Sequence, residues 1–165
     1  MNYHNITVDD MLNGDGLRTV LWVSGCMHHC RGCQNPQTWD EKSGIPFDEA
    51  AKEELFADLS RDYMDGVTFS GGDPLCPANR ETVGRLIAEI RDRFPQKTIW
   101  LYTGDLFESF RDTLPFLPLI DVIVDGPYVE ALRDVNLCWR GSKNQRVIDV
   151  KQTLATGKVV LWARN

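Results

Sequence analysis

The chain has 165 residues, of which 42% are hydrophobic and 25% charged, and its formal net charge is −6. This length suits one globular domain with a substantial core, so we expect residues 1–165 to form a single domain. The acidic balance argues against a nucleic-acid-binding surface, because such surfaces contact phosphates through Lys and Arg. No apolar stretch reaches membrane-spanning length, and the polar start from Met1 to Asp10 is unlike a signal peptide, so we expect a cytoplasmic protein without membrane contact.

The chain begins with a polar stretch, residues 2–12, which predicts at most a short strand. The turn-rich sequence Asn-Gly-Asp-Gly-Leu-Arg follows at residues 13–18, and its two glycines permit a tight loop. Its charged side chains, Asp15 and Arg18, could project toward a ligand or pair with each other. The β-branched and apolar residues from Leu17 to Ser24 then predict a buried strand.

Three cysteines follow that strand directly, since Cys26, Cys30 and Cys33 have the spacing C-x3-C-x2-C. Thiolates this close together on a short loop can converge on one metal centre. Iron–sulfur clusters are usually held by four thiolates, so a cluster held by three keeps one iron open for another ligand. We favour such a cluster as the interpretation of this loop.

Zinc is the main alternative for the same loop, and a disulfide is the third. Structural zinc requires four ligands, and the fourth could come from His28, His29 or Cys76. A disulfide is favoured least, because five cysteines in a chain without a secretory signal indicate a reducing compartment. We expect Cys76 and both histidines not to be ligands.

A second motif, Gly-Gly-Asp-Pro at residues 71–74, follows a predicted helix at 48–63 and a predicted strand at 66–70. Paired glycines at the end of a strand let a ligand approach the backbone closely, because no side chains intervene. The carboxylate of Asp73 beside them can accept hydrogen bonds from an ammonium group.

The remaining chain alternates helix and strand patterns up to residue 125 and is less regular afterwards. Thr103 ends one predicted strand and Asp125 ends another, while a loop at 139–146 is rich in hydrogen-bond donors, including Arg140 and Asn144. The predicted helices lie at 79–94 and 106–112, and the predicted strands at 98–102, 121–125, 147–150 and 159–162.

Alternating strands and helices predict an α/β fold with a mainly parallel sheet. A complete eight-unit barrel needs about 250 residues, so we expect a partial, open barrel of four to six strands. Ligands of such folds lie at the carboxyl ends of the strands, and the cysteine loop, the glycine pair, Thr103 and Asp125 are all predicted at such ends.

The strand followed by C-x3-C-x2-C resembles the signature of the radical S-adenosylmethionine (radical SAM) enzymes. The longer string Ser-Gly-Cys-x-His-x-Cys-x-Gly-Cys-x-Asn at residues 24–35 is similar to that of the activating proteins of anaerobic ribonucleoside-triphosphate reductases. The string Trp-Arg-Gly-Ser-x-Asn-Gln-Arg at 139–146 resembles the same family specifically. The resemblance extends from Gly14 to Arg146.

This resemblance implies a [4Fe-4S] cluster on Cys26, Cys30 and Cys33, with the open iron chelated by the methionine part of SAM. It assigns the SAM ammonium group to the backbone near Gly71 and Gly72, together with Asp73, although many relatives have Glu instead of Asp. Cys76 is also a departure, because relatives often have His there. On the same basis, four further SAM contacts and two residues at the mouth of the site are expected: Thr103, Asp125, Arg140 and Asn144 for SAM, and Asp15 and Arg18 at the mouth.

The implied activity is reductive cleavage of SAM to methionine and a 5′-deoxyadenosyl radical, which abstracts a hydrogen atom from a glycine of a partner protein. The implied partner is the anaerobic ribonucleoside-triphosphate reductase, with an external one-electron donor such as flavodoxin. Three alternatives stay open: an activase of another glycyl-radical enzyme such as pyruvate formate-lyase, a zinc-binding interaction domain, and an electron-transfer iron–sulfur protein that does not use SAM.

Overall fold

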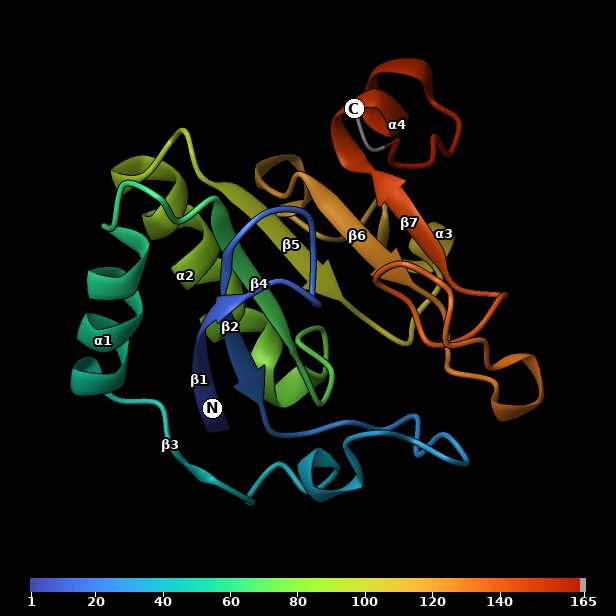
Figure 1. The fold of residues 1–165 in the computed structure, drawn as a ribbon, viewed down its shortest axis with the longest axis horizontal. Helices are drawn as coiled ribbons and strands as arrows, with labels where there is room; N and C mark the ends of the chain where they lie inside the picture. Colours follow the sequence, from blue (N-terminus) through green and yellow to red (C-terminus); the bar gives the residue numbers. More distant parts are fainter. Residues whose placement is uncertain (164–165) are drawn as a thin grey trace.

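The computed structural model describes residues 1–163, which form a seven-stranded sheet with its helices packed against it (Figure 1). No helix in this part of the chain has both the length and the apolar character needed to cross a membrane. The strands are β1 (Asn2–Asp10), β2 (Arg18–Val23), β3 (Ile45–Pro46), β4 (Gly66–Gly71), β5 (Thr98–Tyr102), β6 (Val122–Asp125) and β7 (Arg146–Asp149). The α-helices are α1 (Glu49–Leu59), α2 (Pro77–Arg93), α3 (Phe107–Phe110) and α4 (Val150–Thr156).

The strand order is β3-β1-β2-β4-β5-β6-β7, and the central strands β2, β4, β5 and β6 run parallel. At the edges, β1 and β7 are antiparallel to their neighbours, and β3 pairs with the outer side of β1. The predicted α/β class and the open sheet are therefore confirmed. The antiparallel flanks and the total of seven strands within residues 1–163 go beyond the prediction of four to six mainly parallel strands.

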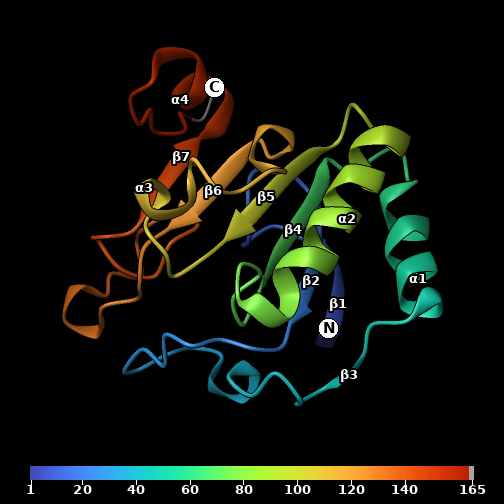
Figure 2. The same ribbon diagram turned by 180° about the vertical axis from the view of Figure 1, so that it is seen from behind.

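Helices α1 and α2 pack on one face of the sheet, and in Figure 2 α2 lies in front of β4 and β2 with α1 beside it. Successive side chains of a strand point to opposite faces, so every second residue of the parallel strands meets the helices. This face is apolar on every central strand, and most of the core lies here. Its buried strand residues are Leu21, Val23, Val67, Phe69, Ile99, Leu101 and Ile123.

The opposite face of the sheet carries a smaller aromatic cluster built around Trp100, which is completely buried. Trp139 and Trp162 approach it edge-on, with ring centroids 5.1 and 5.8 Å away. The loop between β1 and β2 also lies on this face, because the Thr68 hydroxyl of β4 donates a 2.7 Å hydrogen bond to the Asn13 carbonyl. This face therefore holds a small cluster around Trp100 together with polar loop contacts, whereas the helical face holds the main hydrophobic core.

The helix boundaries have local causes that were visible in the sequence. Asp48 caps α1 by accepting a hydrogen bond from the Ala51 backbone, and the helix ends at Leu59, four residues before the predicted end. α2 starts with Pro77 in its first turn, where a missing backbone N–H costs nothing, and it stops shortly before Pro95.

The predicted strand at 159–162 is wrong, because only Leu161 makes an isolated bridge, to Ile148 of β7. The chain turns back after α4 through Gly157, whose φ of +71° is left-handed. Val160 then donates its N–H to the Thr153 hydroxyl of α4 rather than to a neighbouring strand. Two backbone hydrogen bonds to β7 remain, from the Asp149 N–H to the Val160 carbonyl (2.9 Å) and from the Trp162 N–H to the Val147 carbonyl (2.8 Å), but the pairing does not extend into a strand.

Candidate functional site

The three cysteines of the C-x3-C-x2-C motif line one cavity of about 410 Å³ at the carboxyl ends of the parallel strands. Their loop follows β2 and is held by backbone hydrogen bonds from Gly25 to Thr38 (2.7 Å) and from Cys26 to Trp39 (3.0 Å). Cys26, Cys30 and Cys33 are each partly buried, so their thiols are accessible from the cavity. The structure thus brings the three predicted ligands together on one wall.

The other two cysteines lie elsewhere. Cys76 is buried immediately before α2, Cys138 is exposed, and within residues 1–163 neither is part of the cavity lining.

Burial raises the pKa of the Cys26 thiol to about 11. A metal centre at this position would oppose that effect, because a bound cation favours the thiolate.

A single zinc ion would require its ligand atoms to gather closely around one centre. Zinc draws its four ligands to about 2.0–2.3 Å from a single centre. Among the described residues, the only group of three metal-binding side chains gathered that tightly is His28, Asp73 and Asp105, whose ligand atoms lie within 4.8 Å of one another. The three cysteines share a cavity without being drawn together in this way.

The glycine pair at the end of β4 lies against the start of the cysteine loop. The Gly72 N–H donates to the Val23 carbonyl and the Asp73 N–H to the Gly25 carbonyl, both at 2.8 Å. Gly71 has a φ of +101°, and a Cβ at Gly72 would lie 2.5 Å from the Gly25 carbonyl oxygen. Glycine is therefore required at both positions, which keep the two predicted motifs in backbone contact.

The Asp73 carboxylate is almost completely buried, at 3% exposure, and accepts several internal hydrogen bonds. Its Oδ2 accepts from the Thr103 hydroxyl at 3.0 Å and from the Gly104 N–H at 3.1 Å, and it lies 2.9 Å from His28 Nε2. Among residues 1–163, its Oδ1 accepts one hydrogen bond, from the Leu75 N–H at 2.8 Å. A carboxylate offers about four acceptor positions over two oxygens, so Oδ1 is the oxygen with remaining capacity. The hydrogen bond to Asp73 raises the pKa of His28.

Of the four further residues predicted to contact SAM, two line the cavity and two do not. Thr103 and Arg140 line the cavity. Asp125 is completely buried, where it accepts hydrogen bonds from the Phe107 N–H (2.8 Å) and from Arg146 Nε (3.0 Å). Asn144 is exposed and donates to a backbone carbonyl, and in residues 1–163 neither Asn144 nor Asp125 belongs to the lining.

Arg18 and Asp15, predicted at the mouth of the site, are not among the described residues that line this cavity. Arg18 is the first residue of β2, and its side chain is completely buried against β4 and β5, where it donates hydrogen bonds to Thr68 and Thr98. Two other residues of the same loop, Leu12 and Asn13, reach the cavity instead. The role of Asp15 and Arg18 at the mouth stays a prediction.

Three residues that line the cavity were not predicted from the sequence. Trp22 and Ser70 line it from the second-last positions of β2 and β4, and Tyr102 lines it from the last position of β5. The alternation of those strands is the signal that could have identified them. Burial raises the pKa of Tyr102, and its hydroxyl makes no hydrogen bond to any described residue.

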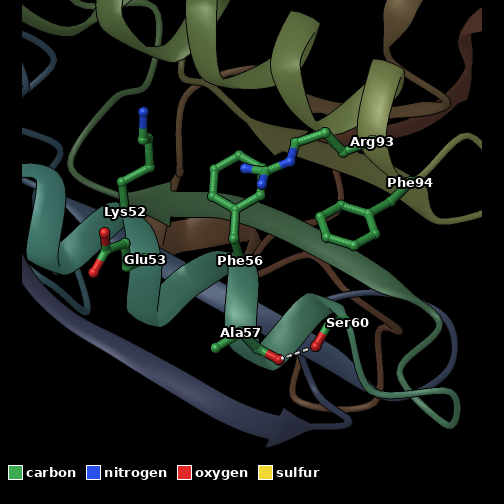
Figure 3. Close-up of a pocket in the computed structure, with 7 residues that line it drawn as sticks. All are labelled: Lys52, Glu53, Phe56, Ala57, Ser60, Arg93 and Phe94. Atoms are coloured by element: carbon green, nitrogen blue, oxygen red, sulfur yellow. Dashed lines mark hydrogen bonds between the residues drawn. The ribbon is translucent and has the colours of Figure 1, made fainter.

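A second cavity, of about 580 Å³, lies between α1 and α2 on the helical face (Figure 3). Its floor is formed by Phe56 and Phe94, and the Arg93 guanidinium lies 4.8 Å from the centre of the Phe56 ring. None of the predicted chemical groups lines it. The predicted cysteine and glycine motifs therefore lie at the cavity of the cysteine loop and not at this one.

Comparison with known proteins supports the same assignment. Residues 12–148 match the family described as a 4Fe-4S single cluster domain. The anaerobic ribonucleoside-triphosphate reductase-activating protein of Enterobacteria phage T4 is 46% identical over 147 residues, covering 89% of this chain and 93% of the relative. The proteins of the same name from Escherichia coli K12 and Vibrio cholerae are 44% and 42% identical, covering 89% and 88% of this chain and 97% and 96% of those relatives.

The alignments cover nearly the whole length of these relatives and nearly the whole of this sequence. The residues matched by the family include all three cysteines of the cavity. The chain therefore belongs to the family of anaerobic ribonucleoside-triphosphate reductase-activating proteins.

Proposed function

We propose that this chain is a radical SAM activase that generates a glycyl radical on an anaerobic ribonucleoside-triphosphate reductase. The observation that carries the proposal is the shared cavity of the three cysteines and the glycine pair, which are joined by the backbone hydrogen bonds from Gly72 and Asp73. The relatives named as activating proteins of this reductase support the choice of partner.

The chain would hold its cofactors as follows. Cys26, Cys30 and Cys33 would bind a [4Fe-4S] cluster as thiolates, and the open side of the cavity would receive SAM. When bound, the cluster supplies the electron that cleaves SAM to methionine and a 5′-deoxyadenosyl radical, while the protein contributes position and exclusion of water.

SAM would be oriented by the residues opposite the cysteines. The backbone carbonyls at Gly71 and Gly72 would accept from its ammonium group, and Asp73 Oδ1 has the capacity to accept one more donor. Thr103 and Arg140, which line the cavity, would contact the parts of SAM other than its ammonium group. In this proposal Asp125 and Asn144, also predicted as SAM contacts, act through the neighbouring loops that they hydrogen-bond.

The reductase would present its glycine loop to the wide side of the cavity. The sheet of the described residues is not closed on itself, and we propose that it is the partial barrel of the radical SAM type. An external one-electron donor such as flavodoxin would reduce the cluster, in the cytoplasm. We expect no nucleic-acid partner, given the net charge of −6.

Iron analysis and an anaerobic visible spectrum of the reconstituted protein test the metal. The expected result is about four irons per chain in the parent, a severe loss in Cys26→Ala, and parental iron in the matched controls Cys76→Ala and Cys138→Ala. Zinc without iron would favour a zinc-binding interaction domain instead. Loss of the cluster in Cys76→Ala would show that the ligand set is not the three-cysteine loop.

Anaerobic incubation of the reduced protein with SAM and a partner tests the reaction. We expect methionine and 5′-deoxyadenosine together with a glycyl doublet in the electron paramagnetic resonance spectrum of the reductase. A doublet on pyruvate formate-lyase and none on the reductase would overturn the choice of partner. Iron without SAM cleavage would reduce the proposal to an electron-transfer protein.

A further inference from the structure

His28 connects the cysteine loop to two other loops of the cavity. It lies between Cys26 and Cys30 in sequence, and its side chain is only 25% exposed. Its Nε2 lies 2.9 Å from Asp73 Oδ2, in the loop after β4, and 3.6 Å from Asp105 Oδ1, in the loop after β5. His28 thus contacts both neighbouring loops from within the cysteine loop.

The space for the His28 ring depends on Gly104. A Cβ at Gly104 would lie 2.6 Å from His28 Nε2 and 2.7 Å from its Cγ, which is closer than real Cβ contacts come. The φ angle of Gly104 is outside the left-handed region, so its backbone conformation does not itself require glycine. The glycine is needed because the histidine ring packs directly on the backbone.

The Asp73 oxygen that faces His28 also accepts hydrogen bonds from other groups. Asp73 Oδ2 accepts from the Thr103 hydroxyl and the Gly104 N–H as well as facing His28. One buried oxygen therefore links the cysteine loop, the end of β4 and the end of β5. The three donors around it also leave little capacity on this oxygen for a metal ion among His28, Asp73 and Asp105.

We propose that His28 is a positioning residue, which fastens the cysteine loop to Asp73 and Gly104 and so holds the cluster ligands in register with the glycine pair. The proposal rests on the proposed function, since the register matters when SAM spans the cluster and the glycine pair. It assigns His28 no contact with iron.

The test is a double-mutant cycle of His28→Ala and Gly104→Ala, with His29→Ala as the matched control. His29 is the exposed neighbour in the same loop, and its ring contacts Trp39 instead, with centroids 4.8 Å apart. Each single variant removes the same contact, one by deleting the ring and the other by displacing it. The double variant has room for the added Cβ, because the ring is gone.

Three measurements on the reconstituted proteins separate positioning from ligation: iron content, SAM affinity by calorimetry, and amide hydrogen exchange of residues 26–33. We expect iron near the parent level in all four variants. Loss of one hydrogen bond to a charged group changes an equilibrium constant by a factor of about ten to a hundred. In both single variants, SAM affinity should therefore fall by this factor, and the rate of amide exchange should rise by it. The changes in affinity and exchange in the double variant should equal those of each single variant, because both substitutions remove the same contact. His29→Ala should resemble the parent, and His28→Gln, which keeps a donor of similar reach, should recover part of the loss.

Exchange that is unchanged in both single variants, or effects that multiply in the double variant, would overturn the inference. Loss of iron in His28→Ala would also overturn it, because it would make His28 a ligand. A parent that holds iron but does not bind SAM would count against the proposed function, whereas the exchange measurement would still decide whether His28 fastens the loop.

Discussion

The buried Arg18 allows a sharp test of what the first loop does. Its guanidinium is completely buried and donates to the hydroxyls of Thr68 (2.7 Å) and Thr98 (2.8 Å) and to the backbone carbonyls of Val67, Thr98 and Asp15. It also lies 5.3 Å from the centre of the Trp100 ring. Arg18→Met removes the charge and the donors while keeping a long side chain in the same space.

The expected cost follows from the acceptors that are left behind. Burial lowers the pKa of Arg18 to about 10, so removing the charge recovers part of its desolvation cost. The Val67 and Thr98 carbonyls then lose their buried donor, at about 1–3 kcal/mol each. A net loss of about 4 kcal/mol corresponds to a thermal midpoint roughly 8–16 °C lower for a chain of this size.

Differential scanning calorimetry at equal cluster loading and one scan rate measures this shift. Arg85→Met is the matched control, because Arg85 is largely exposed and its ion pair with Glu81, one helical turn away, contributes about 0.5 kcal/mol or less. An Arg18→Met variant that melts like Arg85→Met refutes the reasoning. If its stability is parental and activation of the reductase is lost, Arg18 acts at the mouth of the site, as the resemblance implied.

Three further substitutions test individual features of the fold. Gly71→Ala should destabilise by about 1–3 kcal/mol or more in urea unfolding, since its φ of +101° and the β2 backbone 2.8 Å from the added Cβ both oppose it, whereas Gly157→Ala, with open space around its Cβ, should cost less. Arg146→Met leaves the buried Asp125 carboxylate without its cation, so about 3–5 kcal/mol should be lost and Asp125→Asn in the same chain should restore part; parental stability would contradict this. Hydrogen bonds from Arg146 lower the pKa of Glu108 from 4.5 to about 2, so its contribution is present above about pH 4.5 and is lost as the pH falls toward 2; Glu108→Gln should lack this part of the acid dependence, and an unchanged acid profile would exclude it.

The sequence was informative where structure depends on neighbours in the chain. The bounds of β5 match the predicted strand at 98–102, and α1 starts at Glu49, next to the predicted start at 48, because strand alternation and helix capping involve residues a few positions apart. The cysteine loop and the glycine pair were placed at strand ends by the same local patterns, and the cavity contains both.

Only the tertiary structure decided which distant groups meet. His28 and Asp73 are 45 positions apart, and Arg18 and Thr98 are 80 apart, so their contacts depend on strand order and register. The same holds for the antiparallel flanks of the sheet and for the strand predicted at 159–162, where the Val160 N–H bonds to the Thr153 hydroxyl of α4. A sequence pattern specifies which face a side chain occupies, whereas the partner on that face is determined by the packing of the whole sheet.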